Sequence, residues 1–157
     1  MRRIDTIYKP YHATLRRLIA RTHVKFGFGV LVDCHSMPGN IRIAGSNARP
    51  DFILGDRYGT SASAELSRAA MQILEEMGFN AVRNKPYAGG FITEHYGRPS
   101  RGLHALQIEV NRSLYVDETT LEKRPDFDKV AAAITLFMKR MAEHVESYTG
   151  DPALAAE

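Results

Sequence analysis

Residues 103–115 read Leu-His-Ala-Leu-Gln-Ile-Glu-Val-Asn-Arg-Ser-Leu-Tyr, and this stretch decides the fold class. Apolar and polar side chains alternate through its centre, in the order Leu106, Gln107, Ile108, Glu109, Val110 and Asn111. A β-strand places alternate residues on opposite faces. One face of the strand predicted over 104–110 is therefore apolar, and the other carries two amides and a carboxylate. Such a row indicates the polar wall of a pocket, with an ordinary solvent-exposed strand face as the alternative.

A second apolar stretch, Phe28-Gly-Val-Leu-Val-Asp-Cys-His-Ser36, predicts a strand over 28–34 that is buried on both faces, as in parallel sheets. It ends in polar residues that packing does not require. Ligands of open α/β sheets lie outside the carboxyl ends of the strands, and Asp33 and His35 are two residues apart and share a face. This strand end predicts a functional site, with a purely structural histidine as the alternative.

The remaining elements follow from periodicity and turn signals. Helices are expected over 11–24, 62–77 and 126–148, short strands over 51–56 and 80–84, and loops over 38–50 and 85–102. Ser63 is a candidate N-cap of the second helix, and Gly78 closes it. The order of elements predicts an α/β fold with a mainly parallel or mixed sheet of about four strands flanked by helices. A length of 157 residues suits one domain, expected over 1–150, with a frayed tail at 151–157.

Composition excludes several classes of protein. Hydrophobic residues make up 44% of the chain and charged residues 25%, as in ordinary soluble globular proteins. No apolar stretch is long enough to span a bilayer, so no membrane partner is expected. The single cysteine, Cys34, fits a reducing cytoplasm. The net charge is +3, and the densest basic cluster is expected to be a solvated helix face and not a nucleic-acid site. This cluster is Arg16, Arg17, Arg21 and Lys25.

An acid, an imidazole and nearby amides are consistent with metal-assisted hydrolysis. Zn²⁺ binds imidazole and carboxylate groups, and a catalytic zinc usually has three protein ligands and a water molecule. His35 is the best candidate ligand. Glu109 is the best candidate for the base that accepts a proton from the metal-bound water. Asp33 is expected to orient His35 without binding the metal itself.

Four motifs, in the same order along the chain, resemble the N-formylglutamate amidohydrolase family. They are Asp33-Cys-His-Ser-Met-Pro38, Pro50-Asp-Phe-Ile-Leu-Gly-Asp-Arg57, Asn84-Lys-Pro-Tyr-Ala-Gly-Gly-Phe-Ile-Thr93 and Gln107-Ile-Glu-Val-Asn-Arg112. The opening Tyr8-Lys-Pro-Tyr-His12 is similar as well, so the resemblance runs from about residue 8 to 145. It implies a fold like that of zinc carboxypeptidases. It also implies hydrolysis of N-formyl-L-glutamate, or a similar small N-acyl amino acid, to formate and L-glutamate in histidine degradation.

The resemblance also implies roles for particular residues. His35 corresponds to a zinc ligand and Glu109 to the glutamate that activates the metal-bound water. Four further residues are candidates for holding the two carboxylates of the substrate: Asn84, Tyr87, Arg57 and Arg112. Arginine suits this task because its guanidinium offers a bidentate fork. The alternative is that both arginines are ordinary ion-pair partners.

Family members are longer at the N-terminus than this chain, so the resemblance implies that the chain is the C-terminal portion of the family fold. Their additional part carries an early His-containing turn and an acidic residue, which supply the first two zinc ligands. The zinc site is therefore expected to be incomplete here, with His95 and His104 as possible substitutes for the other ligands. The alternative function is a truncated, non-catalytic remnant or a binding module. The sequence predicts no oligomeric state.

Overall fold

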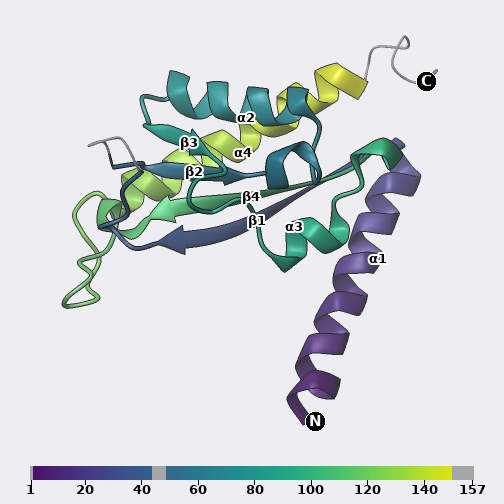
Figure 1. The fold of residues 1–157 in the computed structure, drawn as a ribbon, viewed down its shortest axis with the longest axis horizontal. Helices are drawn as coiled ribbons and strands as arrows, with labels where there is room; N and C mark the ends of the chain where they lie inside the picture. The colour runs from purple at the N-terminus through teal and green to yellow at the C-terminus, as the bar shows by residue number, and fades with distance from the viewer. Residues whose placement is uncertain (1, 44–48, 150–157) are drawn as a thin grey trace.

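Four strands form one mixed sheet in the computed structural model, which describes residues 2–43 and 49–149. The strands are β1 (Gly29–Met37), β2 (Phe52–Gly55), β3 (Ala81–Arg83) and β4 (Leu103–Asn111), in the spatial order β1-β4-β2-β3. β1 is parallel to β4 and β2 is parallel to β3, whereas β2 and β4 are antiparallel. The predicted α/β fold with a mixed sheet is confirmed, and β1 lies at one edge of the sheet (Figure 1).

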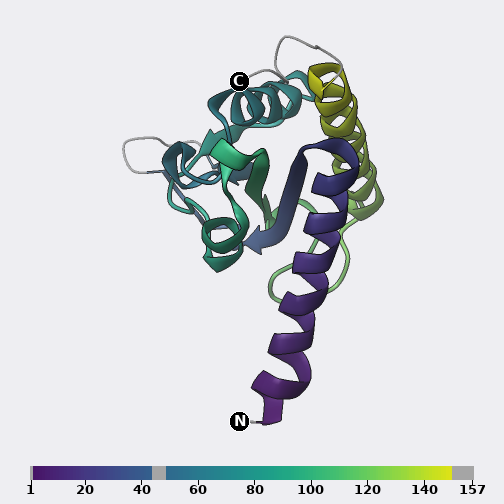
Figure 2. The same cartoon turned by 90° about the vertical axis from the view of Figure 1, so that its right-hand side faces the viewer.

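Helices flank this sheet on both faces. They are α1 (Lys9–Phe26), α2 (Ala64–Glu76), α3 (Phe91–Tyr96) and α4 (Phe127–Thr149), and a π-helical segment, Ile4–Tyr8, precedes α1. Short 3-10 turns follow β2, α3 and β4, at Arg57–Gly59, Pro99–Arg101 and Arg112–Leu114. α2 and α4 lie on one face of the sheet, and α3 lies on the other (Figures 1 and 2).

The hydrophobic core fills the space between the sheet and the pair α2 and α4. It contains the apolar half of β4 together with residues of β2, α2 and α4: Leu106, Ile108, Val110, Phe52, Leu54, Leu66, Ala70, Leu74, Val130, Phe137 and Met141. Local signals fix α2 in place. The side chain of Ser63 accepts a hydrogen bond from the backbone N–H of Leu66 at 3.2 Å, and Gly78 follows the helix with a φ of 84°. Both predicted caps are confirmed.

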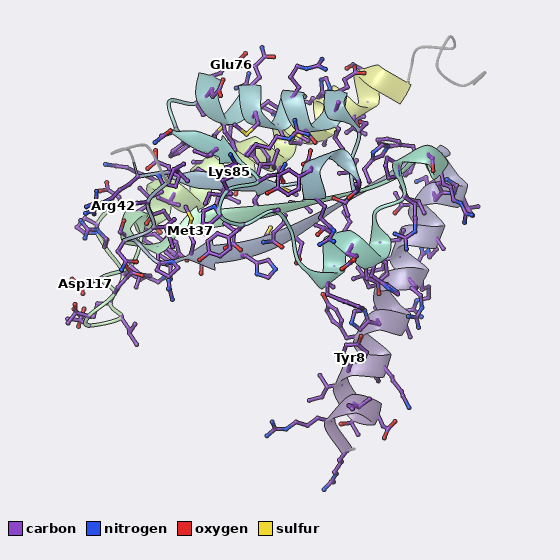
Figure 3. All side chains as sticks on the ribbon, in the orientation of Figure 1. Tyr8, Met37, Arg42, Glu76, Lys85 and Asp117 are labelled. Atoms are coloured by element: carbon purple, nitrogen blue, oxygen red, sulfur yellow. The ribbon has the colours of Figure 1, made fainter. Side chains whose placement is uncertain are left out.

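α1 projects away from the sheet, and Tyr8 lies on the part that is farthest from the strands (Figure 3). Its anchor is His12, which is the buried residue of this helix. Nδ1 of His12 lies within 2.6 Å of the hydroxyl of Tyr96, at the end of α3. α1 therefore connects to the same side of the molecule as α3.

Two of the predicted boundaries are wrong. β1 extends to Met37, because its last residues pair with β4 in register as far as Asn111, so His35 lies inside the strand and not after it. The predicted loop 85–102 contains α3 and a 3-10 turn. The other boundaries shift by at most two residues. The expected tail, 151–157, lies outside the described residues. No helix in the described ranges has the length and hydropathy needed to cross a membrane.

Candidate active site

The polar face of β1 and β4 brings the two principal candidates together. His35 pairs with Glu109, and Asp33 pairs with Gln107, in the parallel register of the two strands. Neighbouring residues of adjacent strands point to the same face. This face is opposite to the one that carries Leu106 and the rest of the core. His35 and Glu109 therefore lie side by side, two residues before the carboxyl ends of their strands.

Asp33 contacts the ring of His35. Nε2 of His35 lies 3.0 Å from Oδ2 of Asp33. The Asp33 side chain is 16% exposed and the His35 side chain 48% exposed, so the ring is open to solvent while the carboxylate that contacts it is largely covered. Because this contact uses Nε2, Nδ1 is the ring nitrogen that would face a ligand.

Glu109 is buried, with 6% of its surface exposed. Burial raises the pKa of its carboxyl, and the nearby charge of Asp33 adds to that effect. His35 and a hydrogen bond from Gln107 lower the pKa, but by less, so that it stays above its ordinary value. A raised pKa brings a carboxylate closer to the range in which it works well as a general base at neutral pH. Burial and pairing of this kind are typical of functional carboxylates.

Gln107 connects Glu109 to the loop that follows β3. Its Nε2 donates to Oε1 of Glu109 at 2.8 Å, and its Oε1 accepts from the backbone N–H of Gly90 at 2.8 Å. Only the carbonyl oxygen can accept from Gly90, so the amide group must present its N–H to Glu109. The sequence placed Gln107 in the polar row but gave it no role. The signal that could have found it is its spacing of two residues from Glu109.

Arg57 lies against the same loop. Its Nη2 is 3.1 Å from Oε1 of Glu94, its Nη1 donates to the carbonyl of Gly89 at 3.4 Å, and its backbone N–H donates to the carbonyl of Ala88 at 2.7 Å. Tyr87 is half-buried in this loop. Arg57 therefore contacts the loop that carries Tyr87, at the two residues that follow it. The structure also gives Arg57 the ion-pair partner that the alternative interpretation expected.

The two other candidates for substrate binding have different surroundings. Asn84 is buried, and its amide exchanges two hydrogen bonds with Asp56. Arg112 lies beyond the end of β4, where its Nε is 3.2 Å from Oε1 of Glu118. Arg112 thus comes from the carboxyl end of the strand that carries Glu109, whereas Asn84 comes from the carboxyl end of β3.

His95 and His104 do not join His35. His104 points to the opposite face of β4, where its Nδ1 accepts from the backbone N–H of Ser63 at 3.1 Å and where burial lowers its pKa. The ring of His95 stacks on Phe91, with centroids 5.0 Å apart. Both histidines therefore have structural roles of their own.

His35 and Asp33 offer donor atoms that zinc accepts, but a catalytic zinc usually needs three protein ligands. Within residues 2–43 and 49–149, no three His, Cys, Asp or Glu side chains are grouped in a way that could hold a metal ion. The described residues therefore do not form a complete zinc site.

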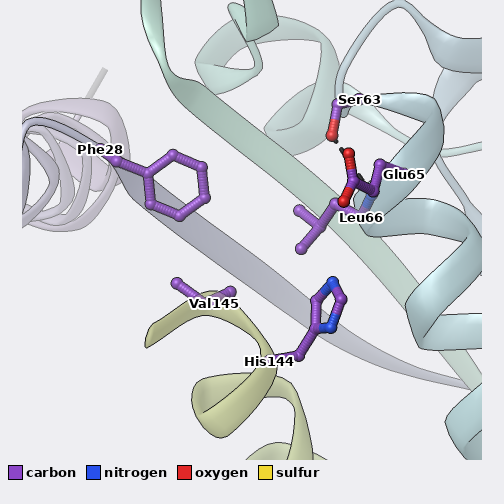
Figure 4. Close-up of a pocket in the computed structure, with 6 residues that line it drawn as sticks. All are labelled: Phe28, Ser63, Glu65, Leu66, His144 and Val145. Atoms are coloured by element: carbon purple, nitrogen blue, oxygen red, sulfur yellow. Dashed lines mark hydrogen bonds between the residues drawn. The ribbon is translucent and has the colours of Figure 1, made fainter. Parts of the chain in front are cut away.

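Among the cavities that adjoin α4, two differ widely in size. The larger one, of about 590 Å³, is lined by Cys34, His35 and Ser36 of β1 and by apolar side chains of α4. A small cavity of about 10 Å³ lies between Phe28, α2 and α4 (Figure 4), with room for one water molecule at most. Glu109 lines neither of them.

Known proteins resemble the chain in both sequence and structure. A sequence model of the N-formylglutamate amidohydrolase family matches residues 1–116. N-formylglutamate deformylases of Pseudomonas putida and Pseudomonas aeruginosa are 38% and 34% identical to the chain over 119 residues, which make up 75% of this chain and 45% of each relative. The chain therefore spans about half the length of the relatives that it matches.

The crystal structure of N-formylglutamate amidohydrolase from Ralstonia eutropha JMP134 superimposes with a TM-score of 0.86 at 36% identity. The superposition covers 93% of this chain and 54% of that one. The gene product Atu2144 from Agrobacterium tumefaciens shares the fold, with a TM-score of 0.61 at 20% identity, over 93% of this chain and 53% of its own.

Proposed function

The chain belongs to the N-formylglutamate amidohydrolase family, and we propose that, together with the part of the family fold that it does not span, it hydrolyses the amide of N-formyl-L-glutamate. A similar small N-acyl amino acid is the wider substrate class. The products are formate and L-glutamate. The observation that carries the proposal is the pairing of His35 with Glu109 on one face of β1 and β4. The proposal includes a role in histidine degradation and a cytoplasmic location, as the family resemblance implies.

Glu109 acts as the general base in this proposal. It takes a proton from the water molecule whose oxygen attacks the formyl carbon. It then returns the proton to the amide nitrogen as the C–N bond breaks, so that the amino acid leaves as the amine. The raised pKa of Glu109 supports this role, because a carboxyl group must hold the proton between the two steps. Gln107 keeps the carboxylate oriented through its 2.8 Å hydrogen bond.

The substrate's carboxylates bind to Arg57 and Arg112, with Asn84 and Tyr87 beside them. Arg57 is paired with Glu94, whose side chain is 61% exposed. A solvent-exposed ion pair contributes about 0–1 kcal/mol, so a substrate carboxylate can replace Glu94 at little cost. Arg112 is paired with Glu118, which is 36% exposed, and the same exchange applies there.

The proposal includes a zinc ion. His35 would supply one of its ligands, and the others would come from outside the described residues. The imidazole of His35 and the carboxylate of Asp33 behind it are a common pair at zinc sites. A bound zinc ion would polarise the formyl carbonyl and lower the pKa of a bound water.

A second candidate function is a non-catalytic module that binds amino-acid carboxylates. It is favoured by the incomplete group of metal ligands among the described residues. In this case the arginines would keep their role, and Glu109 would be a buried polar member of the strand.

Formate release from N-formyl-L-glutamate separates the two functions. The chain should be assayed alone and as a fusion with the part of the Ralstonia eutropha relative that it does not cover, each with added zinc and with a chelator. We expect turnover by the fusion and loss of that turnover in Glu109→Gln. Binding of L-glutamate without turnover by either protein would favour the module. Neither binding nor turnover would contradict both proposals.

A further inference from the structure

Asp56 directly follows β2 and is fully buried. Every side-chain contact it makes is with a donor. Its Oδ1 accepts from Nδ2 of Asn84 at 2.7 Å and from the backbone N–H of Gly59 at 3.2 Å. Its Oδ2 accepts from Oγ of Ser67 at 2.5 Å and from Nε of Arg83 at 2.9 Å. A buried carboxylate is tolerated only when it is paired and hydrogen-bonded in this way.

This environment requires a group that only accepts hydrogen bonds. Arg83 has no acceptor atom, so an amide N–H₂ cannot replace Oδ2. The amide of Asn84 cannot turn round either, because its Oδ1 accepts from the backbone N–H of Asp56 at 3.0 Å. A carboxylate at position 56 is therefore matched to partners from β3, from α2 and from the turn after β2.

The backbone around Asp56 is held in conformations that side chains normally avoid. Arg57, Tyr58 and Asn84 have φ angles of 52°, 56° and 61°. Such residues persist only when the surrounding structure fixes them, and they cluster at functional sites. The carbonyl of Asp56 accepts from the backbone N–H groups of Gly59 and Ser61, each at 3.1 Å. Asp56 thus stabilises the strained turn through both its side chain and its backbone.

We propose that Asp56 is the positioning residue that holds Arg57 and Asn84 as one rigid unit for binding a ligand carboxylate. The two residues follow the carboxyl ends of β2 and β3, which are parallel neighbours. Because Arg83 is tied to Asp56, Arg57 is the cation of this unit that exchanges its exposed partner, Glu94, for a ligand. The identity of the ligand, an N-acyl amino acid, rests on the proposed function. The rigidity of the unit does not.

Hydrogen exchange measured by mass spectrometry tests the unit without any need for activity. In Asp56→Asn, backbone amides in 56–61 and 83–90 should exchange at least about tenfold faster, while those of 103–111 keep the wild-type rate. Arg68→Ala is the control, because it changes an exposed residue of α2 and leaves Asp56 and its hydrogen-bond partners in place. It should change exchange in both segments by less than about twofold. Equal acceleration throughout the Asp56→Asn chain, or none, would overturn the proposal.

Asn84→Gly is the second variant, in case Asp56→Asn does not fold. Glycine accepts the positive φ of position 84, so the variant removes the side chain alone. Asn84 follows β3, whereas segment 56–61 follows β2. If Asp56 and Asn84 form one unit, the loss of the Asn84 side chain should speed up hydrogen exchange in 56–61 as well. Unchanged exchange in 56–61 would show that the two turns are independent and would overturn the proposal.

Isothermal titration calorimetry with N-formyl-L-glutamate measures whether the rigid unit contributes to binding of the ligand. Asp56→Asn should weaken binding at least about tenfold, whereas the control Arg68→Ala should leave it unchanged. Equal binding by Asp56→Asn and the wild type would overturn the positioning role. If the wild-type chain itself does not bind the probe, the proposed function fails in this chain, and the exchange experiment still decides whether Asp56 holds the unit together.

Discussion

Gln107 donates a hydrogen bond to Glu109 at 2.8 Å, from the same face of the same strand. The N–H of Gly90 fixes the amide from the other side. Glu109 is therefore connected, through a single side chain, to the loop that carries Tyr87 and contacts Arg57. Glu109 and Arg57 are thus connected to adjacent residues of one loop, Gly90 and Gly89, although they come from different parts of the sequence.

The raised pKa of Glu109 predicts a pH-dependent gain of stability in Glu109→Gln. Burial makes the native state hold this proton more tightly than the unfolded chain does. The wild-type free energy of unfolding therefore falls as pH rises from the ordinary value of 4.5 through the raised value. The amide that replaces the carboxylate carries no charge, and its oxygen can still accept from Gln107. We expect Glu109→Gln to be more stable than the wild type at pH 7, by about 1.4 kcal/mol for each pKa unit of the shift.

Urea unfolding of both proteins at pH 7 and at pH 4 measures this difference. The gain should shrink at pH 4, where the wild-type carboxyl is mostly protonated in both states. The exposed Glu122→Gln is the control and should show no gain at either pH. A Glu109→Gln protein that is less stable than the wild type at pH 7 would contradict the physical account of this buried carboxylate.

The chain should bind zinc weakly or not at all when it is isolated. Three protein ligands are the usual minimum for a catalytic zinc, and among the described residues no three His, Cys, Asp or Glu side chains are grouped so that they could hold a metal ion. Elemental analysis after reconstitution with zinc and removal of excess metal gives the stoichiometry. One zinc per chain that disappears in His35→Ala would mean that ligands have been missed.

At Gly55, β2 lies against the backbone of the loop that follows β3, and the space there fits only a glycine. A Cβ at this position would lie 2.7 Å from both the carbonyl carbon of Ala88 and the nitrogen of Gly89. These are backbone atoms, so the loop must move. We expect Gly55→Ala to lower the free energy of unfolding by about 1–3 kcal/mol and to weaken the contact between Gly89 and Arg57.

Gly29→Ala is the matched control, since it is also in a strand and its Cβ would meet nothing closer than 3.6 Å, at Leu103. Thermal unfolding of the two variants should differ clearly. Equal melting temperatures would show that the loop is not in the tight contact that the structure describes.

Much of the fold could be predicted because its signals are local. The alternation along β4 and the caps of α2 at Ser63 and Gly78 depend on neighbouring residues alone. α3 was missed because six residues are too few for a helical period to be recognised. The end of β1 was misplaced because the strand continues through polar residues beyond its apolar run. Their strand conformation comes from pairing with β4, and pairing is a property of the whole sheet.

The same distinction applies to the candidate site. His35 and Glu109 could be predicted because each stands out within its own strand. The contact between Asp56 and Asn84 joins residues 28 positions apart, and that between Gln107 and Gly90 joins residues 17 positions apart. Neither residue type nor spacing indicates such contacts. The roles of all these residues in catalysis and binding stay predictions.

Steady-state kinetics with N-formyl-L-glutamate, on the fusion that completes the family fold, would separate the base from the residues that hold the substrate. Glu109→Gln keeps the size of the side chain and removes the proton acceptor. Loss of a general base typically lowers the rate by about 10²–10⁴-fold. KM should change much less, because Glu109 is not expected to hold the carboxylates of the substrate.

Arg112→Ala is the contrasting variant. If Arg112 binds a substrate carboxylate, KM should rise while kcat changes less. Its present partner, Glu118, is partly exposed and can be solvated when the arginine is gone, so the fold should tolerate the change. If Glu109→Gln keeps a near-normal kcat, another residue must be the general base, and Glu109 is only a buried polar residue of β4. An unchanged KM in Arg112→Ala would assign Arg112 to its ion pair alone.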